Sequence, residues 1–193
     1  MTDAGAGATA TFSRVHERTV HQGHIWHVVV ADFVGPDGKP FERDIVRSPG
    51  SVGIVPLFDT PTGFEVVMVR QYRAAFDRDL WEIPAGMRDI PGEPPEDTAA
   101  RELAEEVGLV AGSMERMTQF LPSPGMTDAV AHLFLATDLT EVPRELHGPE
   151  EEHMEVVRLP LAEALGMVDR GEIDNAMAVI GLLLADRRLA ARQ

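Results

Sequence analysis

Apolar and polar residues follow strand-like patterns through the first half of the chain. Residues 24–33 (H-I-W-H-V-V-V-A-D-F) are rich in the β-branched and aromatic types that are typical of strands. A turn signal follows at 35–39 (G-P-D-G-K), and residues 41–47 (F-E-R-D-I-V-R) alternate as a returning strand. Residues 12–47 therefore predict a hairpin or a small sheet at the N-terminus.

The next segments predict the strands of a larger core. Residues 51–58 (S-V-G-I-V-P-L-F) are almost continuously apolar, as in a strand that is buried on both faces. A turn at 59–63 leads into a further strand at 64–73. Residues 80–86 (L-W-E-I-P-A-G) predict a short strand that runs into a loop containing Pro and Gly.

A helix is predicted after this loop. Pro94 and Pro95 suit the first helical turn, whose N–H groups have no partner within the helix, and Glu96 and Asp97 favour its positive end. Gly108 fits the position just beyond the helix C-terminus. Apolar residues at helical spacing predict the buried stripe: Ala99, Ala100, Leu103 and Val107.

The remainder of the chain alternates between strands, polar loops and two closing helices. We expect strands at 117–121, 131–137 and 154–159, loops at 121–129 and 144–152, a helix over about 160–169, and a last helix that begins near Asp174 as its N-cap.

Length and composition indicate one domain, or one domain with a small appendage. The 193 residues are 44% hydrophobic, which is ordinary for a globular protein. We expect a disordered tail at 1–10, an N-terminal β-sheet subdomain at 11–49 and a main domain at 50–193. The sequence has no apolar run of about 18 residues, so it predicts no membrane span. The absence of cysteine excludes disulfides and thiolate metal sites, and a cytoplasmic location is the simplest interpretation.

The net charge of −15 argues against a nucleic-acid partner, because such partners need a basic face. It leaves small anionic substrates open, since divalent cations can lie between an acidic site and a phosphate group.

The predicted helix carries three glutamates on one face. Glu102, Glu105 and Glu106 are spaced i, i+3, i+4, so their like charges repel, and a bound cation would offset that repulsion. The alternative is a solvated acidic helix face. Arg101 lies four residues before Glu105 and can pair with it, and the Pro-Ala-Gly loop at 84–86 can bring a backbone carbonyl to the same place. All-oxygen coordination of this kind favours Mg²⁺ or Mn²⁺.

The stretch from Gly86 to Val110 resembles the Nudix box, whose pattern is G-x5-E-x7-R-E-U-x-E-E-x-G-U with U apolar. From Glu93 onward every fixed position of that pattern is present. Six residues rather than five separate Gly86 from Glu93, and the extra residue falls in a D-I-P-G turn, where an insertion is easily absorbed.

Further motifs resemble the ADP-ribose pyrophosphatase branch of this family, especially its actinobacterial-type members. They are V-R-Q-Y-R (69–73), L-W-E-I-P-A-G (80–86), S-P-G-M-T-D (123–128) and R-G-E-I-D-N-A (170–176). The resemblance implies an α/β fold, an α/β/α sandwich around a mixed sheet, and an N-terminal β domain exchanged across a homodimer. It also implies metal-dependent hydrolysis of ADP-ribose to AMP and ribose 5-phosphate.

The resemblance also implies roles for single residues. Arg73 and Glu82 match positions that line the substrate site. Arg47 is a candidate for a phosphate contact, or else an exposed arginine at a strand end. Trp26 is a candidate to stack on a base from the partner subunit, or else a core or interface tryptophan, whereas Trp81 is expected to pack. The implied metal ligands are Glu102, Glu105, Glu106 and the carbonyl of Ala85, with Arg101 and Glu93 as orienting residues.

One expected residue is missing. In this family the general base is usually a glutamate in the loop after S-P-G, and Ala129 occupies that position. The neighbouring Asp128 can substitute, Glu150–Glu152 form a second source of a base, and water activated by the metal alone is a third alternative. The loop change also leaves open another nucleotide sugar, a broader substrate range, or a binding module with weak turnover.

Overall fold

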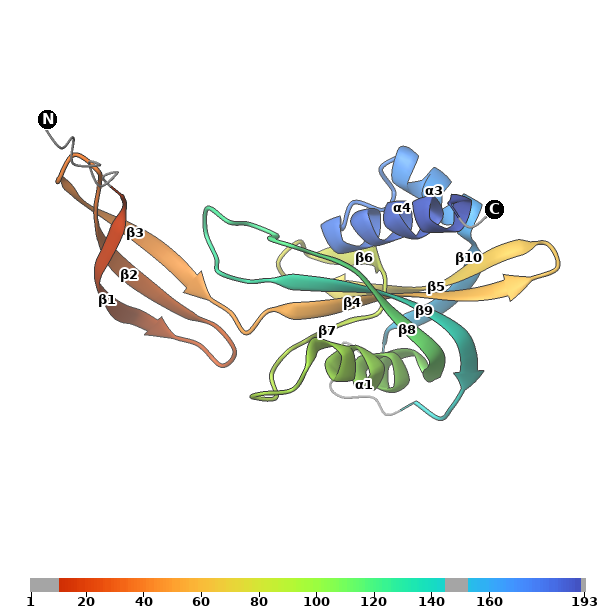
Figure 1. Ribbon diagram of the computed structural model, residues 1–193. Helices are drawn as coiled ribbons and strands as arrows, with labels where there is room; N and C mark the ends of the chain where they lie inside the picture. The colour runs from red at the N-terminus through yellow and green to blue at the C-terminus, as the bar shows by residue number, and fades with distance from the viewer. Residues whose placement is uncertain (1–10, 145–152, 192–193) are drawn as a thin grey trace, which may run out of the picture. The chain divides into compact units, whose positions relative to one another are not determined.

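The computed structural model describes residues 11–144 and 153–191 of the chain, which form two compact units (Figure 1). The first unit comprises the described residues up to Ser48 together with Ser123–Ala129, and the second comprises Pro49–Pro122 and the residues from Val130 onward. The tail predicted at 1–10 and the acidic run Glu150–Glu152 lie outside the described residues.

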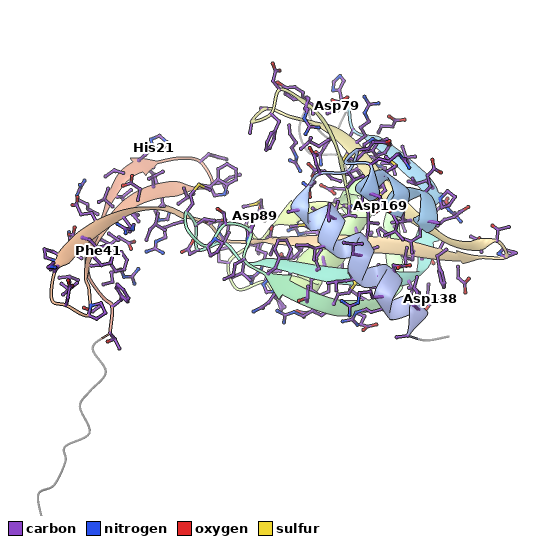
Figure 2. The ribbon with its side chains drawn as sticks, turned by 90° about the horizontal axis from the view of Figure 1, so that it is seen from above. His21, Phe41, Asp79, Asp89, Asp138 and Asp169 are labelled. Atoms are coloured by element: carbon purple, nitrogen blue, oxygen red, sulfur yellow. The ribbon has the colours of Figure 1, made fainter. Side chains whose placement is uncertain are left out.

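The N-terminal unit is a three-stranded antiparallel sheet, as its apolar pattern predicts. Its order is β1-β2-β3, with β1 at Ser13–Gln22, β2 at His27–Val34 and β3 at Pro40–Arg47. Phe33 stacks on Phe41 with ring centroids 5.3 Å apart, and Phe12 meets Phe41 edge-on at 6.0 Å. Phe41 is labelled in Figure 2. These rings add an aromatic cluster to a sheet in which Val29 and Ala31 of β2 are buried.

The main unit is built on a seven-stranded mixed sheet. Its central path is β10-β5-β4-β9-β8, while β6 pairs with β5 and β7 pairs with β4. Strands β4 and β9 are parallel and the other pairs are antiparallel. The bounds are β4 Ser51–Thr60, β5 Gly63–Arg73, β6 Arg78–Glu82, β7 Ala85–Met87, β8 Leu109–Phe120, β9 Ala131–Glu141 and β10 Glu155–Pro160.

Helices cover both faces of this sheet (Figure 1). On one face α1 (Pro95–Val107) packs with Ala99 and Leu103 into a buried cluster against the sheet. On the other face α3 (Leu161–Asp169) and α4 (Ala176–Ala190) bury a second cluster, in which Leu182 is fully enclosed. The α/β/α sandwich around a mixed sheet is therefore confirmed. No helix in the described part of the chain is long and apolar enough to span a membrane.

Two strand predictions need correction. Strand β8 starts at Leu109, not at residue 117. It is an edge strand, and exposure on its open side weakens the apolar alternation by which its first half could be predicted. The strand predicted at 80–86 is two short strands. The first, β6, pairs with β5, and the second, β7, pairs with β4. Between them the Pro84 carbonyl accepts a hydrogen bond from the Ile54 N–H at 2.9 Å.

The N-cap predicted for the last helix is also wrong by one residue. The side chain of Asn175 accepts from the Ala178 N–H at 3.1 Å and caps α4. Asp174 instead forms an ion pair with Arg78. Both residue types are favoured caps, and the ion pair with a residue 96 positions away decides between them.

Candidate active site

Helix α1 carries Glu102, Glu105 and Glu106 on one face, and residues at both of its ends fix where it begins and ends. Pro94 caps it in an extended conformation and Pro95 opens the first turn. At the other end Gly108 has a left-handed conformation (φ 66°, ψ 42°), and its N–H bonds back to the carbonyls of Ala104 and Leu103. The fully buried Ala99 and Leu103 anchor the helix on the sheet, so its glutamates have a fixed orientation.

Glu106 is held against the strand that follows the Pro-Ala-Gly loop. Its side chain is only 5% exposed, and its Oε2 accepts the N–H of Ala85 at 2.9 Å. Ala85 begins β7, so backbone and carboxylate meet where the loop was expected to approach the helix. The contact uses the Ala85 N–H, and its carbonyl remains a predicted metal ligand.

Glu102 lies directly over Gly86. A β-carbon at Gly86 would fall 1.9 Å from the Glu102 carboxylate carbon and within 2.3 Å of both oxygens, so only glycine fits. Burial raises the pKa of Glu102 to about 7; Arg101 lowers it and the charges of Glu105 and Asp89 raise it further. Even with the Arg101 guanidinium beside it, this carboxylate is therefore costly to ionise, and a further cation would favour its charged form.

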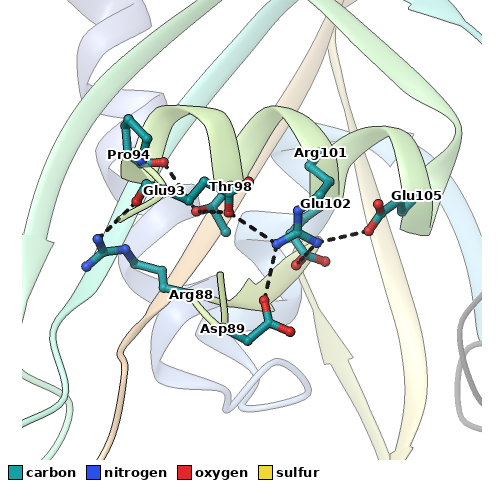
Figure 3. A network of polar contacts seen from close by, with 8 residues as sticks. All are labelled: Arg88, Asp89, Glu93, Pro94, Thr98, Arg101, Glu102 and Glu105. Atoms are coloured by element: carbon teal, nitrogen blue, oxygen red, sulfur yellow. Dashed lines mark hydrogen bonds and ion pairs between the residues drawn. The ribbon is translucent and has the colours of Figure 1, made fainter. Parts of the chain in front are cut away.

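Arg101 links the carboxylates of this face (Figure 3). Its Nη1 donates to Glu102 at 2.8 Å and to Glu105 at 3.0 Å, and its Nη2 lies 3.4 Å from Glu93 and 3.5 Å from Asp89. The i, i+4 pairing of Arg101 with Glu105 is confirmed. The Thr98 hydroxyl donates to Glu93 at 2.8 Å, and this bond together with Arg101 lowers the pKa of Glu93.

The donor set fits a hard divalent cation by its chemistry. The glutamates of α1 supply only oxygen ligands, and two of them, Glu102 and Glu106, are buried. Among residues 11–144 and 153–191, no group of three or more His, Asp or Glu side chains forms a ready-made metal site. In this arrangement the guanidinium of Arg101 provides the positive charge between Glu102 and Glu105.

A cavity of about 210 Å³ adjoins the carboxylate site through Ala85 and Gly86. Within its lining, Arg73 makes a two-pronged ion pair with Glu82, Nε to Oε1 at 2.9 Å and Nη2 to Oε2 at 2.7 Å. The structure thus brings the predicted substrate residues Arg73 and Glu82 beside the predicted metal site. The full lining is Ser51, Arg73, Glu82, Ile83, Ala85, Gly86, Met87, Asn175 and Met177.

Ser51, Asn175 and Met177 were not singled out from the sequence as site residues. Asn175 falls within the R-G-E-I-D-N-A motif, which is the signal that could have found it. A larger cavity of about 570 Å³ opens elsewhere in the main unit, lined in part by Asp59, Phe64 and Leu139, and contains none of the α1 carboxylates.

The remaining predicted site residues belong to the N-terminal unit. Arg47 ends β3 and pairs with Asp128 at 2.9 Å and with Glu17. Trp26 is 51% exposed, so within its own chain it is not a core residue. Trp81, in contrast, packs against the cluster beneath α3 and α4, as expected.

The fold is an α/β/α sandwich in which the carboxylates of α1 adjoin a cavity. Comparisons with known proteins identify the family to which this fold belongs. A model of the NUDIX domain family matches residues 47–179, which include α1 and the adjoining cavity. The chain belongs to the Nudix family. This result confirms the family and the enzyme class, a Nudix hydrolase, that the Gly86–Val110 stretch predicts.

Similar proteins cover most of the chain. An ADP-ribose pyrophosphatase from Mycobacterium tuberculosis is 40% identical over 172 residues, covering 89% of this chain and 82% of the relative. An ADP-ribose pyrophosphatase from Bacillus subtilis is 35% identical over 162 residues, covering 84% and 85%. A crystal structure of an ADP compounds hydrolase matches the fold with a TM-score of 0.80 at 24% identity, over 96% and 97% of the two chains.

Proposed function

We propose that this protein hydrolyses the pyrophosphate bond of ADP-ribose, releasing AMP and ribose 5-phosphate. The observation that carries the proposal is the buried pair Glu102 and Glu106 on α1, held against Gly86 and Ala85 at the wall of a cavity that contains Arg73. The names of the relatives from Mycobacterium tuberculosis and Bacillus subtilis support ADP-ribose as the substrate.

The proposed roles follow from charge and position. Glu102, Glu105, Glu106 and the Ala85 carbonyl would hold Mg²⁺ or Mn²⁺, which when bound neutralises a diphosphate and makes water a better nucleophile. Arg101 orients the carboxylates through its two pairs within α1. In the adjoining cavity, Glu82 fixes the orientation of the Arg73 guanidinium, which lies in the lining where it can contact the substrate.

The proton acceptor is proposed to be Asp128, the one carboxylate in the Ser123–Ala129 segment. Ala129 cannot accept a proton, and its N–H donates to Thr127 Oγ1 at 3.1 Å. Asp128→Asn tests the assignment because it preserves size while removing basicity: we expect a loss of kcat on the order of 10²–10⁴. An unchanged kcat eliminates Asp128 as the base, and a higher rate in Ala129→Glu would point to a base position lost from the loop.

Assembly and location complete the proposal. We propose a homodimer in the cytoplasm, with Trp26 of one subunit stacking on the base bound by the other. The exposed Trp26 side chain is compatible with this role. Sedimentation of the wild type and of Trp26→Ala, together with KM for ADP-ribose, tests both parts, since the variant should raise KM.

The decisive experiment is a substrate panel with product identification in Mg²⁺ or Mn²⁺. We expect AMP from ADP-ribose, and loss of most activity in Glu106→Gln because metal binding is weakened. Glu163→Gln, the same change at an exposed site on α3, should leave the rate unchanged. Comparable rates with several nucleotide sugars would replace ADP-ribose by a broader class, and ligand binding without any AMP release would indicate a binding module.

A further inference from the structure

Arg47 connects three segments of the N-terminal unit that are distant in sequence. It lies at the end of β3, and its Nε and Nη2 donate to Glu17 in β1. Its Nη1 donates to Oδ2 of Asp128 at 2.9 Å, across 81 positions of the chain. The Arg47 side chain is only 17% exposed, so this guanidinium is already engaged on both sides by protein carboxylates.

Backbone hydrogen bonds tie the same loop to the same strand. The Val46 N–H donates to the Met126 carbonyl at 2.9 Å, and Val46 forms a parallel bridge with Thr127. The Ser48 N–H donates to the other carboxylate oxygen of Asp128 at 3.0 Å. The Ser123–Ala129 loop is therefore attached to the N-terminal unit through β3. Asp128 accepts one hydrogen bond from the Arg47 side chain and one from the Ser48 backbone N–H.

We infer that Arg47 is a positioning residue, which holds Asp128 and thereby fixes the Ser123–Ala129 loop, while Glu17 holds Arg47. This role differs from the phosphate contact implied by family resemblance, because each of the three guanidinium nitrogens of Arg47 donates to a carboxylate of the protein. A guanidinium suits the role, since its planar fork can satisfy two carboxylates at once, whereas a lysine offers a single charged point. The catalytic consequence rests on the proposed function; the effect on the loop does not.

Amide hydrogen exchange tests the loop directly in the full chain. Arg47→Ala should speed exchange of the Val46 and Ser48 amides on the order of tenfold, the factor expected when a charge-assisted hydrogen bond is lost. Arg43→Ala, on the same strand and with the same charge change, should leave both amides unaffected, because the Arg43 side chain donates to the Glu42 carbonyl and lies over the Phe41 ring instead of bonding to Asp128. Unchanged exchange in Arg47→Ala overturns the inference.

Two further variants guard against a general loss of folding. Arg47→Lys and Glu17→Gln each keep part of the network, so both should show exchange rates between those of the wild type and Arg47→Ala. Arg47→Ala combined with Asp128→Ala should exchange no faster than the faster single variant, because both remove the same bond. Fully additive effects would show that Arg47 and Asp128 act separately and would overturn the inference.

Steady-state kinetics with ADP-ribose separates positioning from substrate binding. A positioning role predicts that Arg47→Ala lowers kcat by about tenfold or more, with little change in KM. A higher KM with unchanged kcat and unchanged amide exchange would make Arg47 a phosphate ligand instead. If no ADP-ribose hydrolysis is found, the proposed function fails, and the exchange experiment still decides the role of Arg47.

Discussion

At the scale of single residues, Gly86 is a position where the backbone packs directly against a predicted metal ligand. A methyl group there would overlap the carboxylate of Glu102, which is buried and bonded to Arg101 and so cannot easily move away. We expect Gly86→Ala to lower kcat by about 10²-fold, because it displaces a predicted metal ligand by more than an ångström. We also expect a loss of about 1–3 kcal/mol in the free energy of unfolding.

The matched control is Gly166→Ala within α3. There the added methyl would meet only the flexible end of Arg170, at 3.0 Å, and alanine favours a helix. This variant should keep full activity and gain up to about 1 kcal/mol. Activity and stability equal to wild type in Gly86→Ala would contradict the geometry assigned to Glu102.

His132 gives the protein a pH-dependent stability. It is 6% exposed, its Nδ1 lies 2.8 Å from an Nη of Arg116, and its pKa is lowered by burial and by the charges of Arg116 and Arg88. The folded state binds this proton less readily than the unfolded state, so its contribution to stability is complete above about pH 6.5 and is lost as the pH falls through the range below.

We therefore expect urea unfolding between pH 5 and 7.5, in a chelator, to show a pH slope that His132→Gln reduces by up to about 1.4 kcal/mol per pH unit. The exposed His21→Gln serves as the control and should leave the slope unchanged. Parallel wild-type and His132→Gln profiles would rule out this residue as the source.

At the scale of the element, α1 depends on Arg101 as the cation of its acidic face. Removing the guanidinium leaves Glu102 and Glu105 unpaired in a partly buried place. We expect Arg101→Ala to lose on the order of 2–4 kcal/mol of unfolding free energy at pH 8 without metal, measured by chemical denaturation. The loss should be smaller at pH 5, where Glu102, with a pKa of about 7, is protonated.

Arg187→Ala on the exposed side of α4 is the control for the charge change and should cost less than about 1 kcal/mol. Millimolar Mg²⁺ should recover part of the stability of Arg101→Ala if the carboxylates bind the ion. An Arg101→Ala protein as stable as Arg187→Ala would show that the acidic face needs no internal cation.

The elements differ in how far the sequence foretells them. Helix α1 is specified by local sequence signals: two prolines, a buried stripe and a terminal glycine predict its bounds almost to the residue. The first half of β8 has no clear sequence signal, because an edge strand has a weak apolar pattern. The sequence predicts β6 and β7 as one strand, because the change of pairing partner from β5 to β4 depends on tertiary structure. The Glu17–Arg47–Asp128 contacts join residues 30 and 81 positions apart, and no local pattern reports such pairs.

At the scale of the whole molecule, the acidic excess acts on stability as well as on partners. The chain has 32 acidic and 17 basic residues and a pI near 4.8, so folding concentrates like charges. The ion pairs of Arg47, Arg73 and Arg101 offset part of this repulsion. Other acidic residues in the described part of the chain, such as Asp59, Glu163 and Asp186, are exposed, so their charges are open to screening by salt.

Added salt should therefore stabilise the protein at neutral pH. Between about 10 mM and 150 mM NaCl the Debye length falls from roughly 30 Å to 8 Å, which shortens the reach of surface repulsion. We expect the Tm at pH 7.5, measured calorimetrically in a chelator, to rise by about 2–4 °C, equivalent to roughly 1 kcal/mol for a chain of this size. The same salt step near pH 5, close to the pI, should change the Tm little. A Tm that falls with salt at pH 7.5 would mean that the ion pairs of the arginine networks stabilise the fold by more than the net surface charge destabilises it.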